Sequence, residues 1–324
     1  MRRVRKPSRE QGVAVITALL LTTLAITIVA SLFWQQQVQV RSIENQRLQL
    51  QKQWVLRGAL DWSRLILRED ARHSSIDHLG EPWAVPLAET RLDEYVDKSQ
   101  QASGEASDAT LSGSIVDAQS RFNLSNLCRS GVIDDKEVAV FARLLSAARQ
   151  DPALASATAR VMAAAQSKPE QDNSAASDSS SKKTLDILYV DDLLAVPNFT
   201  PEALAAIKDF IVLIPGQVTQ INVNTAPPEV LSARIATLSL SDAQALVAGR
   251  ESAWFKDLAD FKQRLQGTKL DPADEQQLSV STAYFLVNGN VHLNRAGMQM
   301  QSLIQRSIGG PANVATKVIW IRES

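Results

Sequence analysis

VAVITALLLTTLAITIVASLFW, residues Val13–Trp34, contains no charged side chain over its twenty-two positions. As a helix rising about 1.5 Å per residue, it would be roughly 33 Å long, which matches a hydrocarbon core of about 30 Å. The apolar region of an ordinary secretory signal is shorter, about 7–15 residues. The stretch therefore predicts a transmembrane helix that stays attached to the chain, with a plain signal anchor as the alternative.

The flanks of this stretch predict its orientation. Among the first twelve residues, Glu10 is the one acid against five basic residues: Arg2, Arg3, Arg5, Lys6 and Arg9. After the stretch, the next charge is Arg41. Because positive charge gathers on the cytoplasmic side of a membrane helix, the N-terminus is expected in the cytoplasm and the body outside it.

The bulk composition excludes several classes of protein. The chain has 324 residues, 21% of them charged, and a formal net charge of −1, so nothing indicates a polyanionic partner. Its single cysteine, Cys128, cannot form an internal disulfide and is expected to be a buried small side chain. His73, His78 and His292 are the only histidines, and no metal spacing, phosphate loop or nucleophile elbow accompanies them. We therefore expect no enzyme activity.

Residues 35–72 predict a continuation of the same helix. No proline interrupts residues 13–72, and apolar residues recur on one helical face at Val40, Ile43, Leu50 and Trp54. The apolar face that includes Trp54 and Trp62 is expected to be covered by a sheet formed by the later chain.

Strands are predicted in two separated parts of the chain. Thr110–Asp117 alternates small and apolar residues. Near the C-terminus, β-rich runs cover Gln277–Asn288, Asn290–Ala296 and Ala315–Arg322, and Gly289-Asn290 reads as a turn between the first two. These runs predict antiparallel strands.

The region between the strands reads as helical. One helical stretch is predicted from Asp134 to about Gln166, followed by the polar, low-complexity residues 167–183, which predict a flexible loop. Thr200 and Thr225 each precede a proline that suits the start of a helix, so each is expected to cap one, and a further helix is expected to start at Asp271. A helical block between strands indicates an insertion into a sheet domain.

The junction at Gln11-Gly12-Val13, where a basic segment meets the apolar run, resembles the leader of type IV pilin-like proteins. That resemblance implies cleavage by a prepilin peptidase between Gly12 and Val13, and N-methylation of Val13. Pilin-like proteins usually carry a glutamate at the fifth mature position, which here is Thr17. A buried carboxylate in a bilayer is costly unless paired, and in that family the N-terminal amine of a neighbouring subunit is its partner. A subunit with Thr17 forgoes this assembly contact, which fits a place at the end of a filament.

Further segments extend the resemblance to nearly the whole chain. Val116–Leu124 (VDAQSRFNL), Ile221–Leu231 (INVNTAPPEVL) and Tyr284-Phe285, together with the leader, resemble the minor pseudopilin K family of the type II secretion system. The resemblance implies an α+β pseudopilin fold, in which a long N-terminal helix packs on an antiparallel sheet and a large α-helical domain is inserted. It also implies a single-pass protein of the bacterial inner membrane with a periplasmic C-terminal domain. Such a protein caps a pseudopilus with minor pseudopilins I and J on an inner-membrane secretion platform.

On this basis five segments are expected, listed here in chain order: a basic leader at 1–12; a transmembrane helix at 13–34; a periplasmic helix with the first part of the pseudopilin domain at 35–124; an inserted helical domain at 125–276; and completing strands at 277–324. No cofactor is expected. Relatives with bound calcium make calcium conceivable for the family, but its ligands cannot be placed. Asp191-Asp192 and the Asp257/Asp260 pair are candidate calcium ligands only because of their charge. We expect all four to be ordinary solvated carboxylates at the surface.

Two other classes of protein remain as alternatives. INVNTAPPEVL and Phe255–Phe261 (FKDLADF) resemble helix-hairpin-helix modules of DNA-uptake proteins, which grip phosphate through a glycine-hydrophobic-glycine hairpin. The corresponding stretch here, Ser232–Asp242, contains no glycine, so no nucleic-acid partner is expected. A major pilin that forms long fibres is disfavoured by the bulky insertion and by Thr17.

Overall fold

The computed structural model of the protein describes residues 11–92, 109–166, 186–265, 270–293, 296–308 and 314–323. Contacts within the chain divide it into two units, Met1–Arg57 and Gly58–Ser324. Most of the predicted leader and the whole of the predicted loop at 167–183 lie outside the described residues.

The first unit is helical throughout its described part. Helix α1 begins at Gln11 and ends at His73, so its last turns belong to the second unit. Every side chain from Val13 to Trp34 is exposed, and within the described chain this is the one helix long and apolar enough to cross a membrane. Threonine hydroxyls donate to carbonyls one turn earlier, as Thr22 does to Ala18 O at 3.0 Å. The predicted apolar helix is confirmed.

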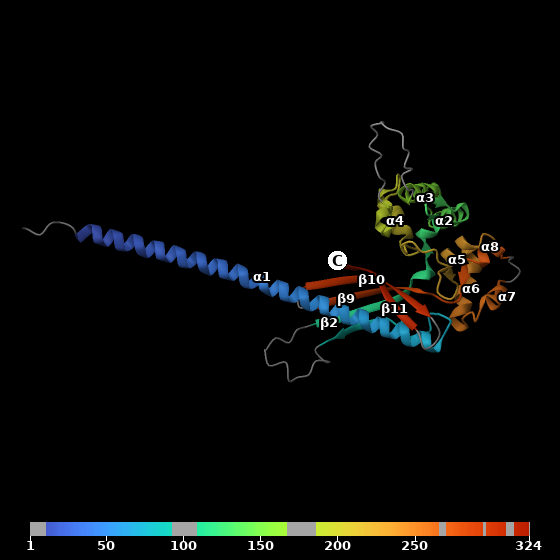
Figure 1. Cartoon of the computed structure of the whole chain (residues 1–324), viewed down its shortest axis with the longest axis horizontal. Helices are drawn as coiled ribbons and strands as arrows, with labels where there is room; N and C mark the ends of the chain where they lie inside the picture. The colour runs from blue at the N-terminus through green and yellow to red at the C-terminus, as the bar shows by residue number, and fades with distance from the viewer. Residues whose placement is uncertain are drawn as a thin grey trace, which may run out of the picture. The chain divides into compact units, whose positions relative to one another are not determined.

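The second unit contains a five-stranded sheet in which every neighbouring pair is antiparallel. Its strand order is β1-β2-β9-β10-β11, with bounds of Leu87–Arg91, Ala109–Asp117, Tyr284–Leu293, Ala296–Ile308 and Val314–Glu323. The sheet thus joins an early and a late part of the chain, as Figure 1 shows by the pairing of green-blue with red strands.

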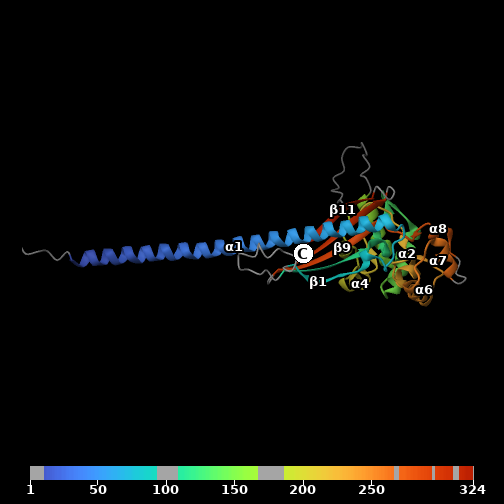
Figure 2. The ribbon, with the colours of Figure 1, turned by 90° about the horizontal axis from the view of Figure 1, so that it is seen from below.

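The last turns of α1 lie along one face of this sheet (Figures 1 and 2). Arg64 of α1 donates to Thr316 O of β11 at 3.2 Å, and Arg306 of β10 donates to Leu67 O at 3.4 Å. The side chains of β9 that share this face, Phe285 and Val287 among them, are buried. Alternation along the strands thus gives the helix an apolar surface to cover.

The helical block covers part of the opposite face of the sheet. Leu286 and Leu303 pack there with Val212 and Ile214, which belong to the strand β6 (Ile211–Val212) and the residues after it. This contact fixes the block to the sheet by apolar burial.

Seven helices make up the described part of the block, and Figure 1 shows them to one side of the sheet: α2 Asp135–Ala147, α3 Ala153–Gln166, α4 Pro201–Ile207, α5 Pro228–Arg234, α6 Leu240–Ser252, α7 Leu258–Arg264 and α8 Pro272–Glu275. Short two-stranded pairings tie their connections together: β3 Phe122–Asn123 with β6, β4 Cys128–Arg129 with β5 Val132–Ile133, and β7 Ile221–Asn222 with β8 Leu278–Ser279. Four 3₁₀ turns complete the described elements: η1 Pro82–Ala84, η4 Ala118–Ser120, η5 Leu124–Leu127 and η6 Val190–Ala195. The block has its own apolar core, which includes Phe122, Phe141 and Leu231.

The α+β class is confirmed, and several local predictions are corrected. The helix expected from Asp134 to Gln166 is two helices, because Arg149 adopts a positive φ of 59° and Pro152 follows. Thr200 caps α4 as predicted, and the helix predicted to start at Asp271 is α8, which Asp271 caps. The boundaries of the five expected segments stay predictions.

The turn expected at Gly289-Asn290 is wrong, because β9 runs straight through it. Gly289 lies opposite Gly113 of β2, and a Cβ on Gly113 would lie 2.7 Å from Asn288 O. The glycines therefore serve close approach of two strands rather than a turn.

The predicted contact with a sheet is wrong for Trp62, which is 62% exposed, whereas Trp54 lies in the first unit and its contact stays a prediction. The buried face of the last turns of α1 is formed by Leu60, Leu67 and Ala71. At 100° per residue, Trp62 lies about 200° around the helix from Leu60, on the opposite side.

Candidate functional site

The N-terminal residues singled out in the sequence lie in the first turns of α1. Gly12 and Val13 follow directly on Gln11, where the helix begins. The Thr17 hydroxyl is placed to donate to Val13 O at 3.1 Å or Ala14 O at 3.0 Å. Thr17 therefore satisfies its polarity within its own helix and needs no partner from another subunit. Cleavage and methylation stay predictions.

The asparagine-rich segment after β6 is a buried junction rather than a ligand site. Asn222 donates through Nδ2 to Asp117 Oδ2 at 2.9 Å and to Asp77 O at 3.0 Å. Asn224 exchanges two hydrogen bonds with the backbone of Phe255, at 2.8 and 2.9 Å. The Asn222 bonds tie the helical block to β2 and to the segment after α1, and the Asn224 bonds fasten two parts of the block to each other.

Thr225 does not cap α5, contrary to the sequence prediction. Helix α5 is preceded by Pro227, which makes no side-chain cap. The Thr225 hydroxyl instead donates to Asp117 Oδ2 at 2.6 Å. The hydroxyl thus donates to a buried carboxylate in a charge-assisted bond, instead of accepting from a backbone N–H at the start of α5.

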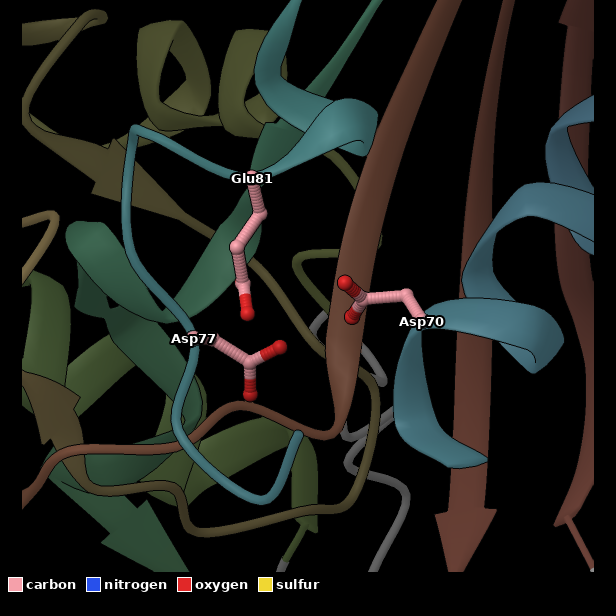
Figure 3. Close-up of side chains that lie close together, drawn as sticks. All are labelled: Asp70, Asp77 and Glu81. Carbon is pink, nitrogen blue, oxygen red and sulfur yellow. The ribbon is translucent and has the colours of Figure 1, made fainter. Parts of the chain in front are cut away.

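Next to this junction lies a second buried cluster, of three carboxylates and one guanidinium. Asp70 stands near the end of α1, while Asp77 and Glu81 lie in the connection that follows it; Figure 3 shows their carboxylates turned toward one another. Arg306 donates to Asp70 Oδ2 at 2.8 Å and makes a short bond to Asp77. Its guanidinium also lies over the ring of Phe285, 4.6 Å from the centroid.

Burial is the largest influence on the pKa values of Asp70 and Asp77. It raises the pKa of Asp70 to about 6, with Glu81 adding to the shift and the bond from Arg306 opposing it. It raises the pKa of Asp77 as well, again against the opposing effect of Arg306. Burial also raises the pKa of Asp117 to about 6, although the bond from Thr225 lowers it. The junction is therefore rich in acids that hold their protons more tightly than in water.

Three carboxylates within 4.8 Å of one another have the donor chemistry of a divalent-cation site. Here, however, the guanidinium of Arg306 already donates to two of them, and Glu81 Oε2 accepts from Trp83 Nε1 at 2.7 Å. Positive charge and N–H donors thus occupy the directions in which a metal ion would bind. This cluster does not fit calcium.

The carboxylates considered for calcium in the sequence are each engaged in a protein contact. Asp191 pairs with Arg322 at 2.6 Å, and Asp192 accepts the backbone N–H groups of residues 188 and 189. Asp257 caps α7 through Asp260 N, and Asp260 itself pairs with Arg264. The structure does not bring the two pairs together into one site.

Cys128 is 3% exposed, and burial raises the pKa of its thiol. His73 lies beside Glu69, whereas His78 stacks on Trp254 at 4.0 Å. None of these side chains forms a nucleophile–base pair with another.

Sequence reasoning missed Arg306, Asp70 and Asp77. Asp117 and Asn222 stood within segments noted for resemblance, but nothing local indicated what they bind. Arg306 and Asp70 are 236 positions apart, so no spacing rule connects them.

Two protein-family models match the chain, and both are described as type II secretion system (T2SS), protein K. They match residues 120–216 and 221–281, which include the junction segments around Asn222. A relative over nearly the full length is the type II secretion system protein K of Pseudomonas aeruginosa. It is 27% identical over 328 residues, covering 95% of this chain and 92% of the relative.

Among solved structures, the chain is similar to one chain in the crystal structure of the GspK-GspI-GspJ complex from the enterotoxigenic Escherichia coli type 2 secretion system. The TM-score is 0.64 with 18% sequence identity, covering 88% of this chain and 99% of that chain. At that identity the likeness concerns the fold, and it agrees with a sheet domain enlarged by a helical block.

Proposed function

We propose that the chain is a member of the type II secretion system protein K family, whose models it matches over residues 120–216 and 221–281, and that it is a minor pseudopilin at the tip of a periplasmic pseudopilus. It acts by assembly and carries out no reaction. The observation that carries the proposal is the joining of one charge-free helix, Val13–Trp34, to a sheet unit bearing a large helical block.

The helix anchors the protein in the inner membrane. Its N-terminus lies in the cytoplasm and the second unit, Gly58–Ser324, in the periplasm, because the basic residues cluster before the apolar run. Within the bilayer, its Ala, Ser and Thr side chains allow partner helices to approach closely. Protease applied to the periplasmic side of opened cells is expected to digest the second unit, and full protection would contradict this orientation.

The partners we propose are the minor pseudopilins I and J, and the solved complex named above contains proteins of these types. The helical block adds bulk beyond the sheet, so a further subunit has no room to stack above this one. Thr17 stands where related proteins have a glutamate, so this chain lacks the carboxylate that would pair with a neighbouring subunit. Its hydroxyl is instead satisfied inside its own helix.

Processing gives the first test. A prepilin peptidase is expected to cut between Gly12 and Val13, leaving a chain of 312 residues, that is 324 minus 12. Gly12→Leu places a branched side chain at the scissile bond and should leave the uncut form, whereas Gly12→Ala keeps a small residue and should still be cut. Intact mass of protein extracted from membranes distinguishes the products. A Gly12→Leu chain that matures to the parent mass would refute the leader assignment.

Co-purification gives the second test. The chain should copurify with the I and J type proteins at unit stoichiometry, and Thr17→Val should not weaken this complex, since the lost hydroxyl serves only its own helix. Extended homopolymers of this chain would support a fibre subunit instead.

A further inference from the structure

A cavity of about 430 Å³ opens between α6 and α7, within the helical block. Its apolar lining includes Leu238, Leu246, Phe255 and Leu265, and its polar lining Asp242, Arg250, Gln263 and Arg264. Of the apolar residues, Leu238, Phe255 and Leu265 also belong to the core of the block. The cavity therefore offers an apolar wall beside charged and polar groups.

Arg250, near the end of α6, also lines this cavity and is 7% exposed. Its one hydrogen bond to the described chain runs from Nη1 to Val223 O at 2.7 Å. Within the same residues, no carboxylate lies at ion-pair distance from it. Arg264, which shares the cavity wall, is by contrast paired with Asp260 and donates to Ala253 O at 2.7 Å.

The isolated guanidinium requires a counter-charge. It carries five N–H donors in a planar fork, and a single carbonyl satisfies only one of them. Burial lowers its pKa to about 10, which still leaves it protonated at neutral pH. Its other donors have no acceptor within the described chain, so a ligand that supplies acceptors in the cavity adds hydrogen bonds that the protein itself does not make.

We propose that this cavity binds a carboxylate carried on an apolar group, with Arg250 as its anchor. A carboxylate matches the fork of a guanidinium with two parallel bonds. The apolar walls suit an aliphatic body beside it. Asp242 at the rim, already bonded to Ser239 Oγ at 2.6 Å, disfavours ligands with several negative charges.

Such a carboxylate has two sources, a small aliphatic acid or the C-terminal end of a polypeptide. Hexanoate is the probe for the first and N-acetyl-leucine for the second. Hexanamide and N-acetyl-leucinamide, which keep the respective bodies without the charge, are the matched controls.

Two variants test the cavity independently of each other. Arg250→Met removes the anchor. Gly249→Leu fills the space, because a Cβ on Gly249 meets nothing within 4 Å and the residue lines the cavity. Ala248→Leu adds the same side chain to the exposed surface of α6 outside the cavity and serves as the matched control.

Binding to the full chain in a non-ionic detergent is measured by calorimetry and by ligand-observed NMR, with the melting temperature of each variant showing that it is folded. At least one carboxylate should bind saturably and at least tenfold more tightly than its amide. Gly249→Leu and Arg250→Met should each weaken it tenfold or more, while Ala248→Leu leaves it unchanged. Preference for N-acetyl-leucine assigns the site to a chain terminus, and preference for hexanoate to a small acid. Equal binding of acid and amide, no binding of either acid, or undiminished binding to folded Gly249→Leu overturns the proposal.

Discussion

Arg306→Met should be among the most destabilising single substitutions in this protein. The arginine is buried and bonded to Asp70, Asp77, Thr282 O and Leu67 O, so methionine leaves two buried carboxylates without their cation. Removing one partner of a buried ion pair typically costs about 3–5 kcal/mol. We expect a loss of that size at pH 8, where both carboxyl groups must ionise.

The loss of unfolding free energy caused by Arg306→Met should be smaller at acidic pH. Arg306 lowers the pKa of both Asp70 and Asp77, so their folded-state pKa values rise further without it. Below these values the folded variant keeps the protons and no longer holds bare charges. In the unsubstituted protein, too, the stability contributed by Asp70 is greater in acid, because its folded-state pKa lies at about 6, above its ordinary 3.8. Between these values the folded state binds more protons, and the free energy of unfolding falls as pH rises.

Urea unfolding of the full chain in detergent, followed by far-UV circular dichroism at pH 5 and pH 8, measures both effects. Arg322→Met is the matched control, because its pair with Asp191 is exposed, with side chains 48% and 57% accessible. Exposed pairs contribute about 0–1 kcal/mol. If the two variants lose the same free energy, or if the loss in Arg306→Met grows in acid, the buried cluster does not stabilise the fold as described.

Three further expectations concern single positions. Gly113→Ala should lower the free energy of unfolding by about 1–3 kcal/mol, because the new Cβ would lie 2.7 Å from Asn288 O. Gly58→Ala is the control: its new Cβ meets nothing within 4 Å, so the substitution should be neutral or stabilising. Equal effects of the two substitutions in urea titrations would contradict this. Thr225→Val removes the 2.6 Å donor to Asp117 and should cost about 1–3 kcal/mol in the same titration, so an unchanged midpoint would show that the bond contributes nothing. Cys128, buried with its pKa raised, should react with iodoacetamide only as fast as the chain unfolds, and rapid labelling of the folded protein would show that the core around it opens.

Much of the helical block could be predicted from local sequence. Thr200 was recognised as a cap, and the helix start at Asp271 was predicted, because a cap acts on the next three residues, within reach of a short pattern. Thr225 carried the same signal and was misassigned, because Asp117, 108 positions away, competes for its hydroxyl. Gly289 likewise signalled a special backbone position, but not that it faces Gly113 of a strand far earlier in the chain.

The candidate site was the less predictable part. Its chemistry comes from single acids and one arginine scattered over α1, β2 and β10, and each of them alone resembles an ordinary surface residue. Segments such as Ile221–Leu231 drew notice through family resemblance, whereas their bonds to Asp77 and Asp117 became visible only in the folded chain.

The sequence by itself determined the apolar helix, because the absence of charge over Val13–Trp34 is a property of consecutive residues and needs no partner to be read. Only the tertiary structure decided which face of α1 is buried, which strands pair, and that Arg306 neutralises Asp70 and Asp77. The buried face of α1 and the Arg306 cluster depend on groups more than two hundred positions apart being brought out of water together, and the pairing of β2 with β9 joins residues more than one hundred and sixty apart. The free energy of these long-range contacts depends on the packing of the whole unit, so no short stretch of the sequence predicts it.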